Sequence, residues 1–445
     1  MSQAVVSKQE VDGANELLEG WEETTFGEAI RSVPINDKKL PKKKYSEHGK
    51  FPVVDQGQEF IGGYCDEKSR LVEEDLPLII FGDHTRIFKY LNQPFVPGAD
   101  GVKVLKPIGV DEKWLFHIAH ALEFPDKGYA RHFQHLKKAR LLIPPLPEQR
   151  RIVARIEALF TRLDAGVAAL KQAKAQLKRY RQSVLAAAVT GELTKAWREA
   201  NPDVETAEVL LERILKERRE QWNGKGKYKE PIVPNAIDDL PGNWTPATSD
   251  QLVHFVTSGS RGWAKYYSDE GATFLRIGNL EHEDIALDLR DIQRVTPPEG
   301  AEGSRTRVQA NDILISITAD VGMVALVDTD IGEAYINQHV ALARPSKEIE
   351  PRYLAWLLAS KPTKAQWKLL QRGATKVGLG LDDIRAVQLG LPPIAEQHQI
   401  VAEIEARTSA IDHLEAELDG QITRSNRLRQ STLSAAFSGN LQTQS

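Results

Sequence analysis

The sequence contains almost no sulfur and no long apolar run. Cys65 is its one cysteine, which excludes an intrachain disulfide and a multi-cysteine zinc site and favours a reducing, cytoplasmic compartment. The longest apolar stretches, such as Leu76–Phe81 and Asp312–Ile317, have the length of a strand, whereas a membrane helix needs about 20 apolar residues. Met1–Glu19 is polar and acidic and does not resemble a signal peptide, so we expect a flexible N-terminal extension.

Motifs that carry chemistry are missing as well. The chain has neither the Asp-Pro-Pro-Tyr nor the Asn-Pro-Pro-Phe tetrapeptide that holds a flipped adenine in amino-methyltransferases. It also lacks the Gly-x-x-x-x-Gly-Lys-Ser/Thr loop that cradles phosphates. His117 and His120, with His132 and His135 nearby, have a spacing compatible with a metal, but packing or surface histidines are favoured. We therefore expect a non-catalytic chain that binds no cofactor or metal itself.

A long internal repeat is the main feature that is present. Leu141–Thr194 aligns with Leu389–Gln442 without a gap, at a constant offset of 248 residues, and 23 of the 54 aligned positions are identical. This period is far longer than the roughly 20–50 residues of a solenoid unit. The repeat predicts two similar halves, each a globular part followed by a long helix, related by a pseudo-two-fold axis.

Each repeat carries an apolar heptad pattern. Residues Glu148–Ala188 contain no proline, and one apolar side chain recurs at every seventh position. The seam of the first copy consists of Ile156, Leu163, Leu170, Leu177 and Val184. Its partner stripe includes Tyr180, and the stripe of the second copy includes Ile404, Ile411, Leu414, Leu418, Ile422 and Leu428. We therefore predict an antiparallel coiled coil of two long helices, with a globular part at each end.

The fold class that we predict is mixed α/β (α+β), because short β-branched runs bounded by Gly, Pro and Asp alternate with helical segments. The predicted parts are a first globular domain at 20–143, a first helical spacer at 144–194, a charged helix and linker at 195–242, a second globular domain at 243–391 and a second helical spacer at 392–442.

Positive charge is concentrated in a few loops, although the net charge is −4. Clustered lysines and arginines suit a phosphate backbone, whose bound counterions they release. In the major groove, arginine can bridge a guanine and asparagine an adenine. For any single lysine, a solvated surface position is the alternative interpretation. The candidate DNA-binding residues are Lys38, Lys39, Lys42, Lys43, Lys44, Arg86, Arg261, Lys265, Arg276, Asn279, Arg372 and Lys376.

Two motifs occur once in each repeat. The first copy reads Leu142-Ile-Pro-Pro-Leu-Pro-Glu-Gln-Arg-Arg-Ile-Val-Ala and Arg181-Gln-Ser-Val-Leu-Ala-Ala-Ala-Val-Thr-Gly-Glu-Leu. The second reads Leu391-Pro-Pro-Ile-Ala-Glu-Gln-His-Gln-Ile-Val-Ala and Arg429-Gln-Ser-Thr-Leu-Ser-Ala-Ala-Phe-Ser-Gly-Asn-Leu. Together they resemble the conserved regions of type I restriction–modification specificity subunits, and the likeness extends over nearly the whole chain from Trp21.

The resemblance implies a bacterial or archaeal protein in which two target-recognition domains read the two halves of a split double-stranded DNA sequence. It also implies two methylation subunits that use S-adenosylmethionine to methylate adenine, and two motor-nuclease restriction subunits that use ATP and Mg. The helical regions would bind the methylation subunits. The candidate partner-binding residues are Glu148, Gln149, Ile152, Arg181, Glu396, Gln397, Ile400 and Arg429.

Two other functions stay open at this point. A stand-alone DNA-modifying enzyme with unrecognised catalytic residues would cut or modify DNA without partners, and the missing motifs weigh against it. A coiled-coil protein scaffold would show no salt-sensitive, sequence-dependent binding to duplex DNA.

Overall fold

The computed structural model describes residues 20–99, 101–122, 131–222, 227–259, 261–297, 301–370 and 378–437. The chain forms two compact units, Met1–Lys171 with Leu418–Ser445 and Gln172–Glu417. The predicted N-terminal extension and the candidate residues Arg372 and Lys376 lie outside the described residues. No helix in the described part is both long and apolar enough to cross a membrane.

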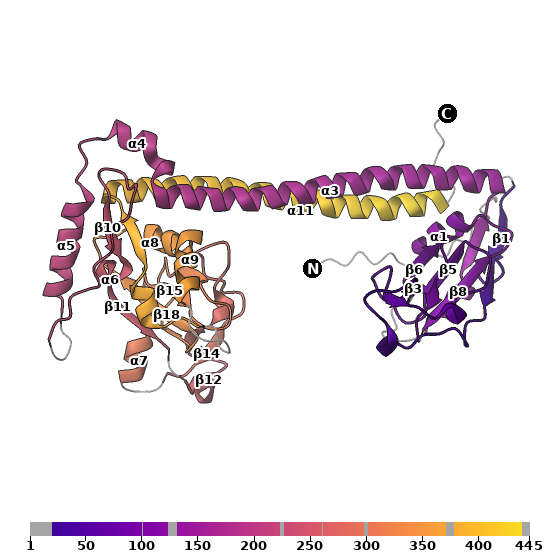
Figure 1. Ribbon diagram of the computed structural model, residues 1–445, viewed down its shortest axis with the longest axis horizontal. Coiled ribbons are helices and arrows are strands. Elements are labelled where there is room, and N and C mark those ends of the chain that lie inside the picture. The colour runs from indigo at the N-terminus through magenta and orange to yellow at the C-terminus, as the bar shows by residue number, and fades with distance from the viewer. Residues whose placement is uncertain are drawn as a thin grey trace. The chain divides into compact units, whose positions relative to one another are not determined.

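The first unit contains a mixed α/β body, coloured indigo in Figure 1. Its strands and helices are β1 (Glu22–Thr25), β2 (Ile30–Val33), β3 (Phe51–Val54), β4 (Gly63–Cys65), β5 (Leu78–Gly82), β6 (Phe88–Leu91), β7 (Val96–Pro97), β8 (Val102–Pro107), α1 (Glu112–Ala121), α2 (Phe133–Lys137) and β9 (Arg140–Ile143). The 3₁₀ turns are η1 (Lys42–Lys44) and η2 (Lys68–Arg70). The long helix α3 (Leu146–Thr190) follows β9 directly.

The second unit contains a second body of the same class. Its strands and α-helices are α4 (Lys195–Ala200), α5 (Ala207–Glu220), β10 (Thr245–Thr248), α6 (Ser249–Leu252), β11 (Val253–Ser258), β12 (Tyr267–Ser268), β13 (Ala272–Leu275), β14 (Gln293–Val295), α7 (Ala301–Thr306), β15 (Ile313–Ser316), β16 (Val324–Leu326), β17 (Ala334–Ile336), β18 (Val340–Pro345), α8 (Pro351–Ala359), α9 (Lys361–Leu370), α10 (Leu381–Arg385) and β19 (Gln388–Leu391). Its 3₁₀ turns are η3 (Glu192–Thr194), η4 (Trp263–Tyr266) and η5 (Ile277–Asn279). The second long helix, α11 (Ile394–Phe437), follows β19.

The two bodies share one topology. The four-stranded sheet β2-β8-β5-β6 of the first corresponds to β11-β18-β15-β16 of the second. The three-stranded sheet β4-β3-β7 of the first corresponds to β14-β13-β17 of the second, to which β12 adds a fourth strand. In both, a parallel pair, β3–β7 or β13–β17, accompanies an antiparallel one. The pairs β1–β9 and β10–β19 close the bodies in the same way. The structural repeat is therefore longer than the one the sequence shows.

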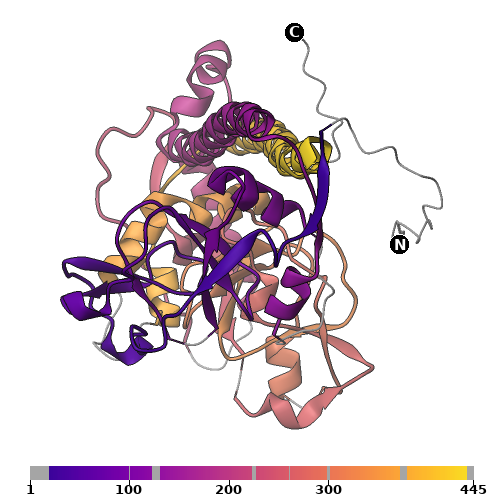
Figure 2. The same ribbon diagram turned by 90° about the vertical axis from the view of Figure 1, so that its right-hand side faces the viewer.

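The long helices pair antiparallel within each unit, as the heptads predict, and Figures 1 and 2 both show them side by side. In the first unit the beginning of α3 packs on the end of α11, where Ile156 and Leu433 share a core. In the second unit the end of α3 packs on the beginning of α11, where Val184 and Ile404 share another. A two-stranded coiled coil leaves its seam partly open, and Leu170 is accordingly half-buried.

Three exposed apolar residues correct the predicted stripes, and one of them is Leu414 of the second copy, which is 45% exposed. Tyr180 is 49% exposed and Leu428, its counterpart in the repeat, is 54% exposed. The seam position belongs to the next residue in each copy, Arg181 or Arg429. These arginines form ion pairs with Asp412 and Asp164 respectively, and these two carboxylates are themselves 248 residues apart. The internal repeat therefore extends to single ion pairs.

A repeated amide joint fixes each body to its long helix. The side-chain oxygen of Gln149 accepts the backbone N–H of Asp111 at 2.7 Å, and its amide nitrogen donates to the carbonyl of Pro144 at 2.8 Å. In the second unit, Gln397 accepts the N–H of Glu350 and donates to Pro392, both at 3.0 Å. Asp111 and Glu350 are the N-caps of α1 and α8, so each glutamine orients one body helix.

Ion pairs reinforce this joint on the outside. Lys113, two residues after its N-cap, lies 2.7 Å from Glu157 of α3. Arg352, two residues after the other N-cap, lies 2.6 Å from Glu405 of α11. Both pairs are about half exposed, so they contribute less than the buried glutamines, which are at most 1% exposed.

We predict that Gln149→Ala destabilises the first unit and Gln397→Ala the second, each by about 1–3 kcal/mol, because each leaves a buried N–H and a buried carbonyl without a partner. Urea unfolding of the full chain measures the loss. Gln176→Ala, an exposed change on α3, serves as the control. Equal stability of the two joint variants and the control would contradict the role of the glutamines.

Candidate nucleic-acid interface

Polar loops gather at one edge of the first body. The backbone N–H of His84, in the β5–β6 turn, donates to Gln56, which follows β3, at 3.3 Å. The hydroxyl of Thr85 donates to the carbonyl of Gln56 at 2.7 Å. Thr85 and Arg86 are exposed, and Arg86 has a φ of 62° at the tip of the turn. This edge therefore presents amide, hydroxyl and guanidinium groups that can form hydrogen bonds with base edges.

A buried lysine supports this edge from below. Lys89 of β6 is 3% exposed, and its ammonium donates to the backbone carbonyls of Asp55 at 2.8 Å and Glu59 at 2.5 Å. Burial lowers the pKa of Lys89, and the nearby carboxylates of Asp55 and Glu59 oppose the shift. The Tyr45 hydroxyl donates to Asp55, and burial, with the negative charge of Asp55, raises the pKa of Tyr45 to about 12.

The second body has an equivalent edge. The β15–β16 turn carries Thr318, whose hydroxyl lies 2.5 Å from Nδ1 of His339, in the turn between β17 and β18. Gln338 lies beside Nε2 of the same ring at 2.9 Å. Ala319 has a φ of 60° at the tip of its turn, as Arg86 has in the first body. The two edges thus share one corresponding turn, β5–β6 in the first body and β15–β16 in the second, and carry different side chains.

Asn279 corrects the sequence prediction. It is 2% exposed, and its side-chain oxygen accepts the N–H of Arg276 at 2.9 Å. Its amide nitrogen donates to the carbonyls of Asp288 and Asp291 at 2.8 and 3.0 Å. Because every hydrogen-bonding group of this amide is used inside the body, Asn279 supports a loop and is not available to a base. Arg276 itself is half-buried and reaches Asp291 at 3.3 Å.

Only some lysines of the predicted basic loop in the first body are exposed and without an ion pair among the described residues. Lys42, Lys43 and Lys44 form the exposed turn η1 and have no ion pair within the part of the chain that the structure describes. Tyr45 follows directly and reaches Asp55, which places these lysines beside the polar edge. By contrast, Lys38 pairs with Glu73 at 3.2 Å, and Lys39 is half-buried. Among the predicted lysines of this loop that the structure describes, those of η1 are therefore the most accessible.

The basic loop of the second body leads into β12 of the sheet β12-β14-β13-β17. Arg261 and Lys265 are exposed, and the ammonium of Lys265 is 4.9 Å from the ring of Tyr266. Trp263 between them is 2% exposed and stacks on Phe274 of β13 at 5.1 Å. The tryptophan is thus a core residue that holds the loop, and the cations are its accessible part.

Most of the predicted partner-binding residues are used inside the chain. Gln149, Gln397, Ile152 and Ile400 are buried at the joints and cores, and Arg181 is 5% exposed. Glu396 is fully buried; it accepts hydrogen bonds from Thr194 and Arg198, and from the indole nitrogen of Trp244 at 2.9 Å. Glu148 and Arg429 alone keep accessible side-chain surface, at 30% and 37%. These motifs recur because the same internal joint is built twice.

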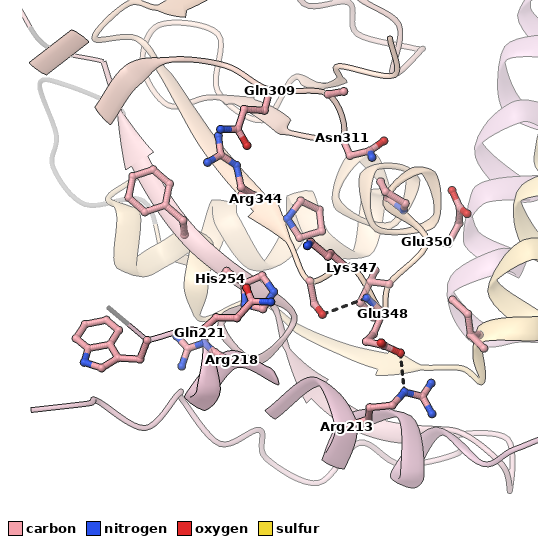
Figure 3. Close-up of a pocket in the computed structure, with 18 of the residues that line it drawn as sticks. Arg213, Arg218, Gln221, His254, Gln309, Asn311, Arg344, Lys347, Glu348 and Glu350 are labelled. Atoms are coloured by element: carbon pink, nitrogen blue, oxygen red, sulfur yellow. Dashed lines mark hydrogen bonds and ion pairs between the residues drawn. The ribbon is translucent and has the colours of Figure 1, made fainter. Parts of the chain in front are cut away.

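The charged segment after the first repeat is part of the second body. Ala207, Leu210 and Ile214 of α5 are fully buried in its core. Beside this helix lies a cavity of about 1000 Å³, in which Arg213 is bonded to Glu348 (Figure 3). Arg218 and Arg344 lining it are paired with Asp250 and Asp312. Because carboxylates of the chain itself neutralise these arginines, the cavity is a poor binding site for an anion. The ion pairs of Arg213 and Arg218 instead help to hold α5 on the second body.

The histidine group of the first body serves packing. His117 is 9% exposed, and its ring lies edge-on to Phe160 at 5.9 Å. Burial lowers the pKa of His117, so its neutral form is favoured. No cluster of three metal-ligating side chains occurs among the residues described.

Sequence reasoning missed several residues of the two edges. Gln56, Thr85, Thr318, Gln338 and His339 are not part of any charge cluster or repeat. Their position in the chain could have identified them, because each lies just after a buried strand or in a short turn between two strands. That signal identified Arg86 and Arg276, and it applies equally to uncharged residues.

The described chain thus consists of two bodies of one topology, each with a polar edge and each joined to its own long helix. The family described as "Type I restriction modification DNA specificity domain" matches residues 18–179 and 297–424. This is more than half of the chain, which therefore belongs to this family.

Individual proteins similar to this chain are specificity subunits of type I restriction enzymes. The type I restriction enzyme EcoBI specificity subunit of Escherichia coli is 31% identical over 314 residues, which cover 69% of this chain and 60% of that protein. The EcoKI specificity subunit of E. coli K12 is 28% identical over 312 residues, covering 68% and 58%. The matched part thus spans about three fifths of these relatives.

A solved structure supports the fold. One chain from work on the "complex assembly and conformational transition of the type I R-M system" matches with a TM-score of 0.65 and 19% identity, covering 96% of this chain and all of that one.

We predict that Lys89→Met destabilises the first unit by about 1–3 kcal/mol and disorders the edge around Gln56, because the backbone carbonyls of Asp55 and Glu59 lose the buried donor that they share. Urea unfolding measures the loss, and Lys50→Met, at an exposed position, is the control. Finding the two variants equally stable would show that the lysine does not support the edge.

Proposed function

We propose that this chain is the DNA sequence-specificity subunit of a type I restriction–modification complex and has no catalytic activity itself. Its two bodies would each read one half of a split target in double-stranded DNA. The observation that carries this proposal is the repeated topology with unlike edges: Gln56, Thr85 and Arg86 in one body, and Thr318, Gln338 and His339 in the other. Identical heads would read a palindrome, whereas unlike heads read two different half-sites.

Each body supplies both parts of DNA recognition. Cations position a protein on phosphates without reading sequence, and hydrogen-bonding groups at base edges specify it. In the first body, η1 supplies the exposed lysines and the β5–β6 turn supplies the polar groups beside them. In the second body, Arg261 and Lys265 take the first role and the turn at Thr318 the second.

The helices would have two tasks in this proposal. They would set the gap between the half-sites, and their outer surface would bind two methylation subunits, to which two motor-nuclease restriction subunits are added. S-adenosylmethionine, ATP and Mg would belong to those partners, and the complex would act in the cytoplasm of a bacterial or archaeal cell. Glu148 and Arg429 are the predicted contacts that remain accessible for such partners.

Mapping methylated adenines tests the proposal. In DNA from cells that express this chain with its methylation subunits, we expect one asymmetric, two-part motif with a fixed gap. Arg86→Ala should relax one half of that motif, at a cost of about 1–3 kcal/mol in binding, and leave the other half unchanged. A continuous motif, or modification of DNA by this chain without partners, would refute the proposal.

A further inference from the structure

A pocket rich in basic groups lies between the long helix α3 and the second body. It has a volume of about 300 Å³. Its lining includes Leu185 of α3 and Trp356 of α8, and its one acidic group among the described residues is Glu283. The basic groups that line it are Lys178, Arg181, His282, Lys361 and Lys364.

Some basic groups of this pocket have an acidic partner and others have none among the described residues. Lys178 pairs with Glu283, and His282 reaches Asp320 at 2.8 Å. Lys361 and Lys364 have no ion pair or hydrogen bond from their side chains within the described residues. Lys364 is only partly accessible, and burial lowers its pKa, against the pull of Asp320 and Glu283. An ammonium that has lost part of its water without gaining an acceptor is stabilised by an incoming anion.

The position of the pocket indicates which anion. The stem of Lys364 packs beside Gly322, in the same turn as Thr318, and Asp320 of that turn is the partner of His282. A duplex whose bases face this turn must therefore pass its backbone close to the pocket. Lys361 opens α9, so the positive end of that helix adds to the attraction.

We propose that Lys178, Lys361 and Lys364 bind the phosphate backbone of duplex DNA next to the second half-site, outside the bases that are read. This inference rests on the proposed function and adds a sequence-independent contact in which the spacer helix itself takes part. The site cannot be recognised in the sequence, because Lys178 on α3 and Lys361 on α9 are far apart in the chain and come together only in the fold.

The test measures binding of duplex DNA at several salt concentrations, with the full chain purified together with its methylation subunits. For Lys361→Met with Lys364→Met, we expect weaker binding to every sequence and an unchanged methylated motif. The slope of log K against log salt should fall by about 0.9 for each lost phosphate contact. Replacing both residues with arginine should restore the slope. Lys195→Met with Lys216→Met, at exposed positions elsewhere in the second unit, is the matched control.

The outcomes separate the two levels of the proposal. If the wild-type chain binds and methylates its target but the methionine variant shows the same affinity and salt slope, the phosphate site is refuted and the proposed function stands. If inorganic phosphate raises the Tm of the wild type but not of the variant while the DNA slope is unchanged, the pocket binds free phosphate and the inference is again wrong. If the wild-type complex binds no duplex, both proposals fail.

Discussion

An apolar seam along each long helix is the constraint on which the rest of the structure depends. α3 and α11 expose a stripe of apolar side chains at heptad spacing, and such a stripe cannot remain in water. In each unit the stripe of one helix covers that of the other. Arg181 and Arg429 occupy seam positions, and their ion pairs with Asp412 and Asp164 fix the antiparallel register.

The glutamine joint fixes the orientation of each body on its long helix. Gln149 and Gln397 each bind the N-cap of a body helix and the proline that precedes their own helix, so a body cannot turn on its helix without breaking buried hydrogen bonds. Natural selection can then vary the edges while the joint stays constant. This explains why the helices retain recognisable identity although the bodies share little beyond topology.

The helices, the repeat and many of the strands follow from the sequence because their signals are local. Heptads, Pro-Pro pairs and β-branched runs predict α3, α11, β5 and β15 within a few residues. The candidate site is less predictable. Asn279 has the residue type of a base reader but is buried, because its amide is needed to close a loop. Gln149 and Glu396 recur for reasons of internal packing, and a repeat alone cannot distinguish an internal joint from a surface for a partner.

Duplicating Thr190–Leu193 tests the central claim most directly, because it lengthens the connection at the end of α3 while both bodies and both glutamine joints keep their sequences. The measurement is the position of methylated adenines in DNA from cells that carry the altered chain with its methylation subunits. The account predicts the same two half-site sequences with a longer gap. Altered half-site bases, or an unchanged gap, would contradict it.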